Sequence, residues 1–338
     1  MNWFERLTGF TETSYDETRR KLEVDRGQLR SLVNDRTYGI GTLELVSLQD
    51  LRERVQPRPD PYSRRLKVRL LTGDVRRLHA SPDLAGALFQ VASQFNLLEM
   101  ISPEVTPEQG VTRYEQDGTQ GPACAMAAGA ATIYRNYFAS VGGKQGQTST
   151  RQLDGLADVG ASLAEILGKS VDDLWTMRNG YALCTRAGLE AIDAWHDLST
   201  PEHIDRLRGM LRIGLHHDVE VTDSDDPRRP VVSQAFCSAL PVAYSEMAPI
   251  HWRGFASLVL EAAYEATLWA AVASAQRGGS NTVLLTSLGG GAFGNNEEWI
   301  TSAMGRALRM VANFDLDVRL VSYRAPSRAF TELAAEFS

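Results

Sequence analysis

Apolar and polar residues alternate along the chain in patterns that predict both strands and helices. Short apolar runs rich in β-branched residues predict strands, at 66–71, 85–95, 231–244, 282–288 and 317–323. Apolar residues three or four positions apart predict helices, at 12–22, 48–54, 121–135, 156–167, 200–214, 255–277, 296–311 and from 326 onward. Strands alternating with helices favour an α/β sandwich with helices on both faces of a mixed central sheet.

Proline-rich and glycine-rich segments divide this pattern into parts. The run Gln56-Pro57-Arg58-Pro59-Asp60-Pro61 breaks regular structure, so we expect a helical N-terminal extension at 1–62 and a catalytic domain at 63–338. Residues from about 140 to 230 are expected to form an inserted α/β segment. Within it, Arg178-Asn179-Gly180 predicts a hairpin, because Asn-Gly suits the positive φ angles of a type I′ turn.

Charge and hydropathy narrow the class of protein. The net charge is −7 and the pI is about 5.5, so nucleic acid is not an expected partner. No membrane contact is expected either, because the apolar stretch 258–275 is interrupted by Glu261 and Glu265. The N-terminus has no signal-peptide pattern.

The cysteines and histidines show no metal-ligand spacing. Cys124, Cys184 and Cys237 lie far apart in the sequence and are expected to be free thiols in a reducing cytoplasm. His216 and His217 are interpreted as a solvated pair in the insertion. No metal and no cofactor is therefore expected.

The segment 282–295 carries the most informative motif. The strand at 282–288 ends in Gly289-Gly290-Gly291-Ala292-Phe293-Gly294-Asn295, and a helix follows. A strand, a glycine loop and a helix start bring bare backbone N–H groups up to a phosphate. The loop contains no lysine, so an NTPase is not expected.

Two other segments converge on the same kind of site. Gln94-Phe95-Asn96 ends an apolar strand, and ligands of open α/β sheets bind at the carboxyl ends of strands. Residues 114–122 place Glu115, Asp117, Thr119 and Gln120 before the helix opened by Gly121-Pro122. Acids would repel a phosphate there, so chemistry or ribose contact is the expected role.

Simpler interpretations stay open for these residues. Asp117 and Thr119 are also residues that turns and helix caps favour. Residues 289–294 are also compatible with a packing turn. Glu297 and Glu298 match the dipole of the helix that they begin.

At these positions the chain resembles the macrodomain-type ADP-ribosylhydrolases. The 289–295 loop is similar to the Gly-Ala-Phe-Gly phosphate loop of poly(ADP-ribose) glycohydrolase, and Leu71-Thr72-Gly73-Asp74-Val75 is similar to the turn that opens a macrodomain. The segments 94–99 and 119–122 resemble a divergent, bacterial-effector-like branch that removes ADP-ribose from arginine, including on modified ubiquitin. The Gln-Glu-Glu signature of poly(ADP-ribose) glycohydrolase is absent, so polymer cleavage is not predicted and the catalytic carboxylate stays open.

The resemblance implies a macrodomain-like three-layer sandwich and a metal-independent hydrolase that cleaves the glycosidic bond at the ribose anomeric carbon. A carboxylate beside that carbon stabilises its developing positive charge; Asp117 is the first candidate, followed by Glu115 and Glu108. The expected partner is ADP-ribose or an ADP-ribosylated protein. The expected ligand-binding residues are Asp74, Gln94, Asn96, Thr119, Gln120, Gly121, Gly289, Gly290, Gly291, Ala292, Phe293, Gly294, Asn295 and Tyr323.

Three rival functions share these features. A non-catalytic ADP-ribose reader would need the same loop and the same Asp74. An enzyme acting on another nucleotide diphosphate would also use a glycine loop. The third rival is an interaction protein in which the loop is only a turn.

Overall fold

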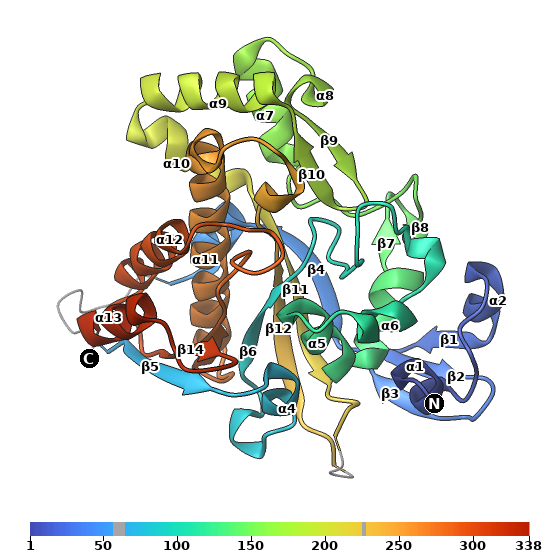
Figure 1. Cartoon of the computed structure of the whole chain (residues 1–338). Coiled ribbons are helices and arrows are strands. Elements are labelled where there is room, and N and C mark those ends of the chain that lie inside the picture. The colour runs from blue at the N-terminus through green and yellow to red at the C-terminus, as the bar shows by residue number, and fades with distance from the viewer. Residues whose placement is uncertain (57–64, 225–227, 338) are drawn as a thin grey trace.

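A seven-stranded mixed sheet runs through the centre of the computed structural model (Figure 1). The structure describes residues 1–56, 65–224 and 228–337. Its strand order is β4 (Thr42–Ser47), β11 (Arg212–Glu220), β12 (Val231–Cys237), β6 (Leu88–Ala92), β13 (Thr282–Leu285), β14 (Asp317–Ser322) and β5 (Lys67–Thr72). Neighbours from β12 to β5 are parallel, whereas β11 is antiparallel to both β12 and β4. The carboxyl ends of five strands therefore meet at one edge, where α/β sheets bind ligands.

Helices cover both faces of this sheet, so the predicted three-layer α/β sandwich is confirmed. One face carries the following helices: α3 (Leu48–Arg54), α11 (Arg253–Gln276) and α12 (Glu297–Met310). The other face carries α4 (Val75–His79), α5 (Gln120–Ala127) and α6 (Gly129–Tyr137). The C-terminal α13 (Arg328–Glu336) packs against α12 and β5 (Figure 1).

The central sheet separates two hydrophobic cores, and strand β6 contributes side chains to both of them. Leu88 packs toward α11, whereas Phe89 and Val91 pack toward α4 and α5. A strand buried on both faces reads as a continuous apolar run, which is why the sequence reveals it.

Helix α11 is the central helix of the larger core. Within the described residues, the segment Pro249–Gln276 is long and apolar enough to cross a membrane, yet 83% of its most apolar window is buried inside the protein. Tyr264, Glu265 and Thr267 are polar residues on its buried surface. The burial explains its composition as that of a core helix.

The N-terminal extension, which the sequence predicted to be helical, contains strands as well as helices. It contains α1 (Trp3–Thr8), α2 (Tyr15–Arg20) and an antiparallel sheet of β1 (Leu22–Asp25), β2 (Gln28–Ser31) and β3 (Thr37–Gly39). Arg26 (φ 46°) and Gly27 (φ 76°) form the tight turn between β1 and β2, and positive φ at both positions suits a hairpin. The extension then supplies β4 to the central sheet. The predicted boundary at 57–62 lies outside the described residues.

The insertion is shorter than predicted. It contains β7 (Ser140–Val141), β8 (Lys144–Gln145), α7 (Ala157–Leu167), α8 (Val171–Leu174), β9 (Trp175–Arg178), β10 (Tyr181–Cys184), α9 (Arg186–Leu198) and α10 (Pro201–Met210). The hairpin prediction is confirmed, with Asn179 at φ 47° and Gly180 at φ 82°. Residues 212–220 belong instead to the core as β11, because this strand pairs with both β4 and β12 in the central sheet. His216 is consequently fully buried, not solvated.

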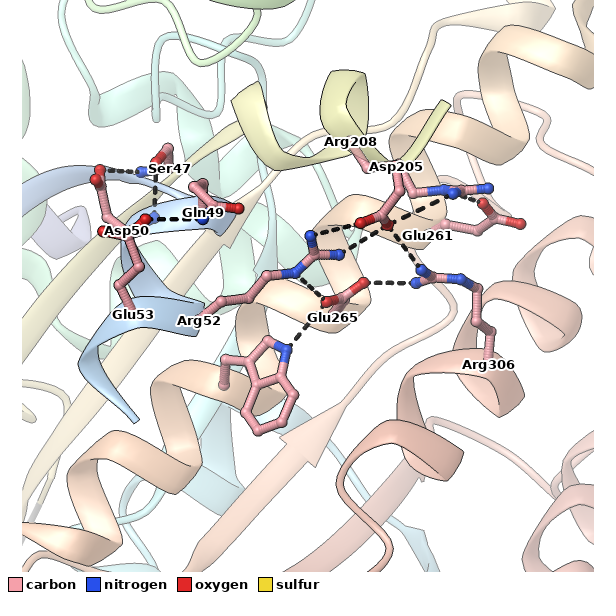
Figure 2. Close-up of polar contacts among 11 residues, drawn as sticks. Ser47, Gln49, Asp50, Arg52, Glu53, Asp205, Arg208, Glu261, Glu265 and Arg306 are labelled. Carbon is pink, nitrogen blue, oxygen red and sulfur yellow. Dashed lines mark hydrogen bonds and ion pairs between the residues drawn. The ribbon is translucent and has the colours of Figure 1, made fainter. Parts of the chain in front are cut away.

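A network of ion pairs joins the extension, the insertion and the core (Figure 2). Glu265 of α11 is buried and accepts hydrogen bonds from Arg52 of α3 (2.6 Å) and Arg306 of α12. Asp205 of α10 accepts two hydrogen bonds from Arg52, at 2.8 and 2.9 Å. Arg208 of α10 reaches Glu261 of α11. Four helices from three parts of the chain are therefore fixed together by charge.

Candidate active site

A cleft opens at the carboxyl ends of the parallel strands. Its inner section lies between the end of β6, the start of α5 and the 289–293 loop, and its outer section extends toward the ends of β5 and β14. The outer section holds about 670 Å³, within the roughly 300–1,000 Å³ of typical small-molecule sites. Both sections share Asp117, Thr119, Gln120, Thr286 and Ser287.

The glycine loop forms one wall of the inner section and presents backbone donors. The N–H groups of Gly291, Ala292 and Phe293 have no hydrogen-bond acceptor among the described residues. Gly291 and Ala292 are exposed and Phe293 is half-buried. Successive free N–H groups in a turn form an anion-binding concavity, so this wall suits a phosphate or a diphosphate.

Two side chains, one of them outside the predicted set, hold this loop in place. Tyr264 Oη of α11 donates to the Thr286 carbonyl (2.6 Å) and accepts from the Leu288 N–H (2.9 Å). Asn295 was predicted to bind ligand, but it is buried and donates to the Leu240 carbonyl (2.8 Å). It therefore fastens the loop to the segment after β12 and does not line the cleft.

A strained turn after β6 brings a carboxyl group into the cleft. Leu97 has φ 64°, an uncommon value for a residue with a bulky side chain. The Leu97 N–H donates to Gln94 O (2.9 Å), and the Leu98 N–H donates to Asn96 Oδ1 (3.1 Å). The chain reverses and places Glu99 in the inner section.

Glu99 is the main residue that the sequence-based candidate set missed. The residue is 2% exposed, and its Oε1 has no hydrogen-bond partner among the described residues. Burial raises the pKa of the Glu99 carboxyl well above its usual value, and the negative charge of Asp117 raises it further; buried Arg135 opposes both. A buried carboxyl with a raised pKa inside a cleft is a candidate general acid.

Asp117 lies in a more solvated environment than Glu99. It is half-buried, lines both sections, and accepts a hydrogen bond from the Thr119 N–H (2.8 Å). Two carboxyl groups in one cleft, one buried and one solvated, are the arrangement that separates acid and base roles. The structure thus places Asp117 beside both Glu99 and the glycine loop.

The other two predicted carboxylates do not line the inner section. Glu115 is exposed and lines only the outer section. Glu108 lines neither section, because its carboxylate accepts from the Ser149 N–H (2.8 Å) and hydroxyl. Its role is to fasten the segment before α5 to the insertion.

Asp74 and Tyr323, two predicted ligand-binding residues that are far apart in the chain, both line the outer section. Asp74 caps α4 by accepting from the Arg76 N–H (2.9 Å). Tyr323 follows β14 and is 74% exposed. A carboxylate and an open aromatic face are suited to the amino group and the ring of a base.

The predicted amide residues are engaged by the protein. Gln120 lines the cleft, yet its side chain accepts from the Ala92 N–H (2.9 Å) and donates to the Gln90 carbonyl (2.8 Å). Gln94 lines the inner section and pairs with Met100 N–H (2.8 Å). Asn96 is fully buried, donates to Gln152 (2.8 Å) and does not line the cleft. These amides therefore shape the site and do not present free groups to a ligand.

Of the remaining predicted residues, several contribute to the lining: Thr119, Gly121, Gly289, Gly291, Ala292 and Phe293. Gly290 and Gly294 do not line it. Gly294 (φ 69°) must be glycine, because a Cβ there would lie 2.8 Å from the Ala243 Cβ. Gly121 is constrained more strongly, since its Cβ would lie 1.9 Å from the Ala92 carbonyl oxygen and 2.3 Å from Glu99 Oε2.

The insertion also reaches the site. Tyr181 of β10 lines the inner section, donates to the Met100 carbonyl (2.7 Å) and contacts the rings of Tyr244 and Phe293, each at 5.3 Å between centroids. Because an aromatic residue of the hairpin lines the inner section, the insertion is part of the site. The Asn179-Gly180 turn identifies the hairpin in the sequence, but nothing in the sequence shows where it docks.

Metal-binding clusters and reactive cysteines do not occur in this cleft. No group of three His, Cys, Asp or Glu residues is placed to hold a metal ion within the described ranges. Cys124 and Cys237 are buried, and burial raises the pKa of both thiols. The carboxyl groups are therefore the candidate reactive groups.

Comparisons with known proteins find solved structures with low sequence identity and low TM-scores. No family model matches the sequence, and no curated protein matches it. A solved poly(ADP-ribose) glycohydrolase from Thermomonospora curvata is 16% identical with a TM-score of 0.44, covering 96% of each chain. The enzyme from Deinococcus radiodurans in complex with ADP-ribose is 13% identical with a TM-score of 0.42, covering 87% of this chain and 93% of that one. Likeness at this level does not establish a function.

Proposed function

We propose that the protein is an ADP-ribosylhydrolase that releases ADP-ribose from modified protein side chains. One observation carries the proposal: free backbone N–H groups of the glycine loop and the Glu99–Asp117 carboxyl pair line the same cleft. The loop is suited to the diphosphate, and the carboxyl pair is suited to the ribose beside it. Asp74 and Tyr323 in the outer section are placed to receive the adenine.

The two carboxyl groups would divide the chemistry. As the bond from the anomeric carbon to the leaving atom breaks, its electron pair goes to that atom and positive charge develops on the sugar. The ionised Asp117 stabilises this charge and takes one proton from the attacking water, whose oxygen bonds to the anomeric carbon. Glu99 gives its proton to the leaving atom.

Arginine is the side chain that we propose as the carrier. Its guanidine nitrogen is basic and readily accepts the proton of Glu99 as it leaves. The resemblance of the 94–99 and 119–122 segments to enzymes acting on arginine and on modified ubiquitin supports the same choice. The scheme requires no metal, so EDTA is expected to leave the rate unchanged.

Two variants test the proposal. The rate of ADP-ribose release from a protein modified on arginine is measured for Asp117→Asn and Glu99→Gln. General acid–base groups contribute roughly 10²–10⁴-fold, and we expect losses of that size while ADP-ribose binding by calorimetry persists. Glu165→Gln, an exposed acid of α7 in the insertion, serves as the matched control.

The same assay separates the alternatives. Proteins modified on serine or glutamate, and poly(ADP-ribose), are tested beside the arginine substrate. Faster release from any of these would overturn the arginine assignment alone. Full activity of Asp117→Asn, or wild-type protein that does not bind ADP-ribose, would overturn the proposed site.

A further inference from the structure

A carboxylate of the N-terminal extension reaches the segment that leads to Asp117. Glu12 lies between α1 and α2, and its Oε1 accepts from the Val111 N–H (2.9 Å) while its Oε2 accepts from the Thr112 N–H (2.7 Å). The Tyr137 hydroxyl donates to Glu12 Oε1 (2.8 Å). The two amides begin the 3₁₀ helix η3 (Thr112–Gln116), where N–H groups have no partner inside the helix.

A second side chain of the extension grips the same point. Trp3 Nε1 donates to the Thr112 carbonyl (3.3 Å). The backbone before η3 also wraps closely around Glu12: Gly110 has φ 81°, and a Cβ there would lie 2.3 Å from Glu12 Oε2. Residues separated by about 100 positions in the sequence are therefore fixed together.

Helix η3 in turn positions both carboxyl groups of the cleft. Tyr114, in its middle, is buried, and its hydroxyl accepts from the Glu99 N–H (2.9 Å). Asp117 directly follows η3, and its N–H donates to the Tyr114 carbonyl (3.2 Å). A shift of η3 would move Asp117 and Glu99 relative to each other.

We propose that Glu12 is a positioning residue for the Glu99–Asp117 pair, so that the N-terminal extension is a working part of the active site. The inference rests on the proposed function. Glu12 does not line the cleft and does not touch the glycine loop, so its contribution falls on the carboxyl pair and not on diphosphate binding. Misplacement of catalytic groups by about 1 Å can cost on the order of 10²-fold in rate.

Glu12→Gln is the test variant, because it keeps the side-chain volume but turns an amide NH₂ toward a backbone N–H. We expect kcat to fall by roughly 10- to 100-fold, with unchanged affinity for ADP-ribose by calorimetry and an altered pH profile of kcat. Hydrogen exchange of the Val111 and Thr112 amides is expected to accelerate. Glu17→Gln, an exposed carboxylate of α2 in the same extension, is expected to behave as wild type.

The outcomes are distinguishable. An inactive wild type would overturn the proposed function, and this inference with it. An active wild type with an equally active Glu12→Gln variant would overturn the positioning role alone. If kcat falls only in proportion to the unfolded fraction measured by calorimetry, Glu12 is a stabilising contact and the positioning role is overturned as well. Glu12→Asp, which keeps the charge, should recover part of the rate.

Discussion

The ion-pair network around Glu265 predicts that replacing this one buried carboxylate by an amide lowers the stability of the protein substantially. Glu265→Gln keeps the shape of the side chain and leaves its acceptor for Trp269 Nε1 (3.0 Å). It removes the buried charge that faces Arg52 and Arg306, whose side chains are only 19% and 26% exposed. Among the described residues, Asp205 would then be the carboxylate that still contacts both guanidinium groups.

The magnitude follows from the geometry. Removing one partner of a buried ion pair costs about 3–5 kcal/mol, and the remaining contact with Asp205 favours the lower end. At about 2.1 cal/mol/K per residue, 338 residues have an unfolding entropy of about 0.7 kcal/mol/K. A loss of about 3 kcal/mol therefore lowers the midpoint of thermal unfolding by about 4 °C.

Differential scanning calorimetry at neutral pH measures this shift. Glu332→Gln is the matched control, because its partner Arg328 is 92% exposed and Glu332 is 62% exposed; exposed pairs contribute little, so no measurable shift is expected. Equal midpoints for the two variants would refute the claim that buried charge holds α3, α10, α11 and α12 together.

Two further predictions concern pH and the cleft. His79 is fully buried, donates from Nδ1 to the Val75 carbonyl (2.8 Å), and burial lowers its pKa to about 4. Its folded-state pKa lies below the unfolded value of about 6.5, so its contribution to stability is present above pH 6.5 and is lost as the pH falls toward 4, by about 2 kcal/mol at pH 5. In urea unfolding, the free energy of unfolding of His79→Gln should therefore decline less between pH 7 and 5 than that of the wild type. An equal decline in both proteins would contradict this. Gly121→Ala should lose activity and about 1–3 kcal/mol of stability through overpacking, whereas Gly118→Ala, whose added Cβ meets nothing within 4 Å, should lose neither, as activity assays and urea unfolding will show.

The sequence predicts local structure well where the signal is local. The Asn179-Gly180 hairpin and the strand, loop and helix at 282–310 occur as expected, because turn chemistry and periodicity act over a few residues. Asp117 and Gly289 both line the inner section and Asp74 and Tyr323 both line the outer section, at the edge of the sheet where parallel strands end. Strand β4 was missed because its partner β11 lies about 170 residues further along the chain.

The position of a polar side chain near the cleft is decided by distant partners, which is why only some of the predicted residues line the cleft. Asn96 was expected at the end of a strand, but β6 ends at Ala92 and Asn96 lies in the turn that follows. Its side chain there accepts from the Leu98 N–H and donates to Gln152. Glu99 follows three residues later within an apolar run and carries no motif of its own. A charged residue inside an apolar run therefore indicates a candidate functional residue, because burying a charge without a pairing partner is costly and such a residue persists where a function needs it.

The environment of Glu99 is assembled from three parts of the chain that no short pattern links. Tyr114 fixes its backbone, Arg135 of α6 supplies the opposing buried charge, and Gly121 leaves room for its carboxyl group. The extension reaches the same point through Glu12. The raised pKa of Glu99 thus depends on residues that lie far apart in the sequence, and the half-buried Asp117 carboxylate lines the same cleft. Chemistry of this kind is a property of the folded chain that its separate motifs do not contain.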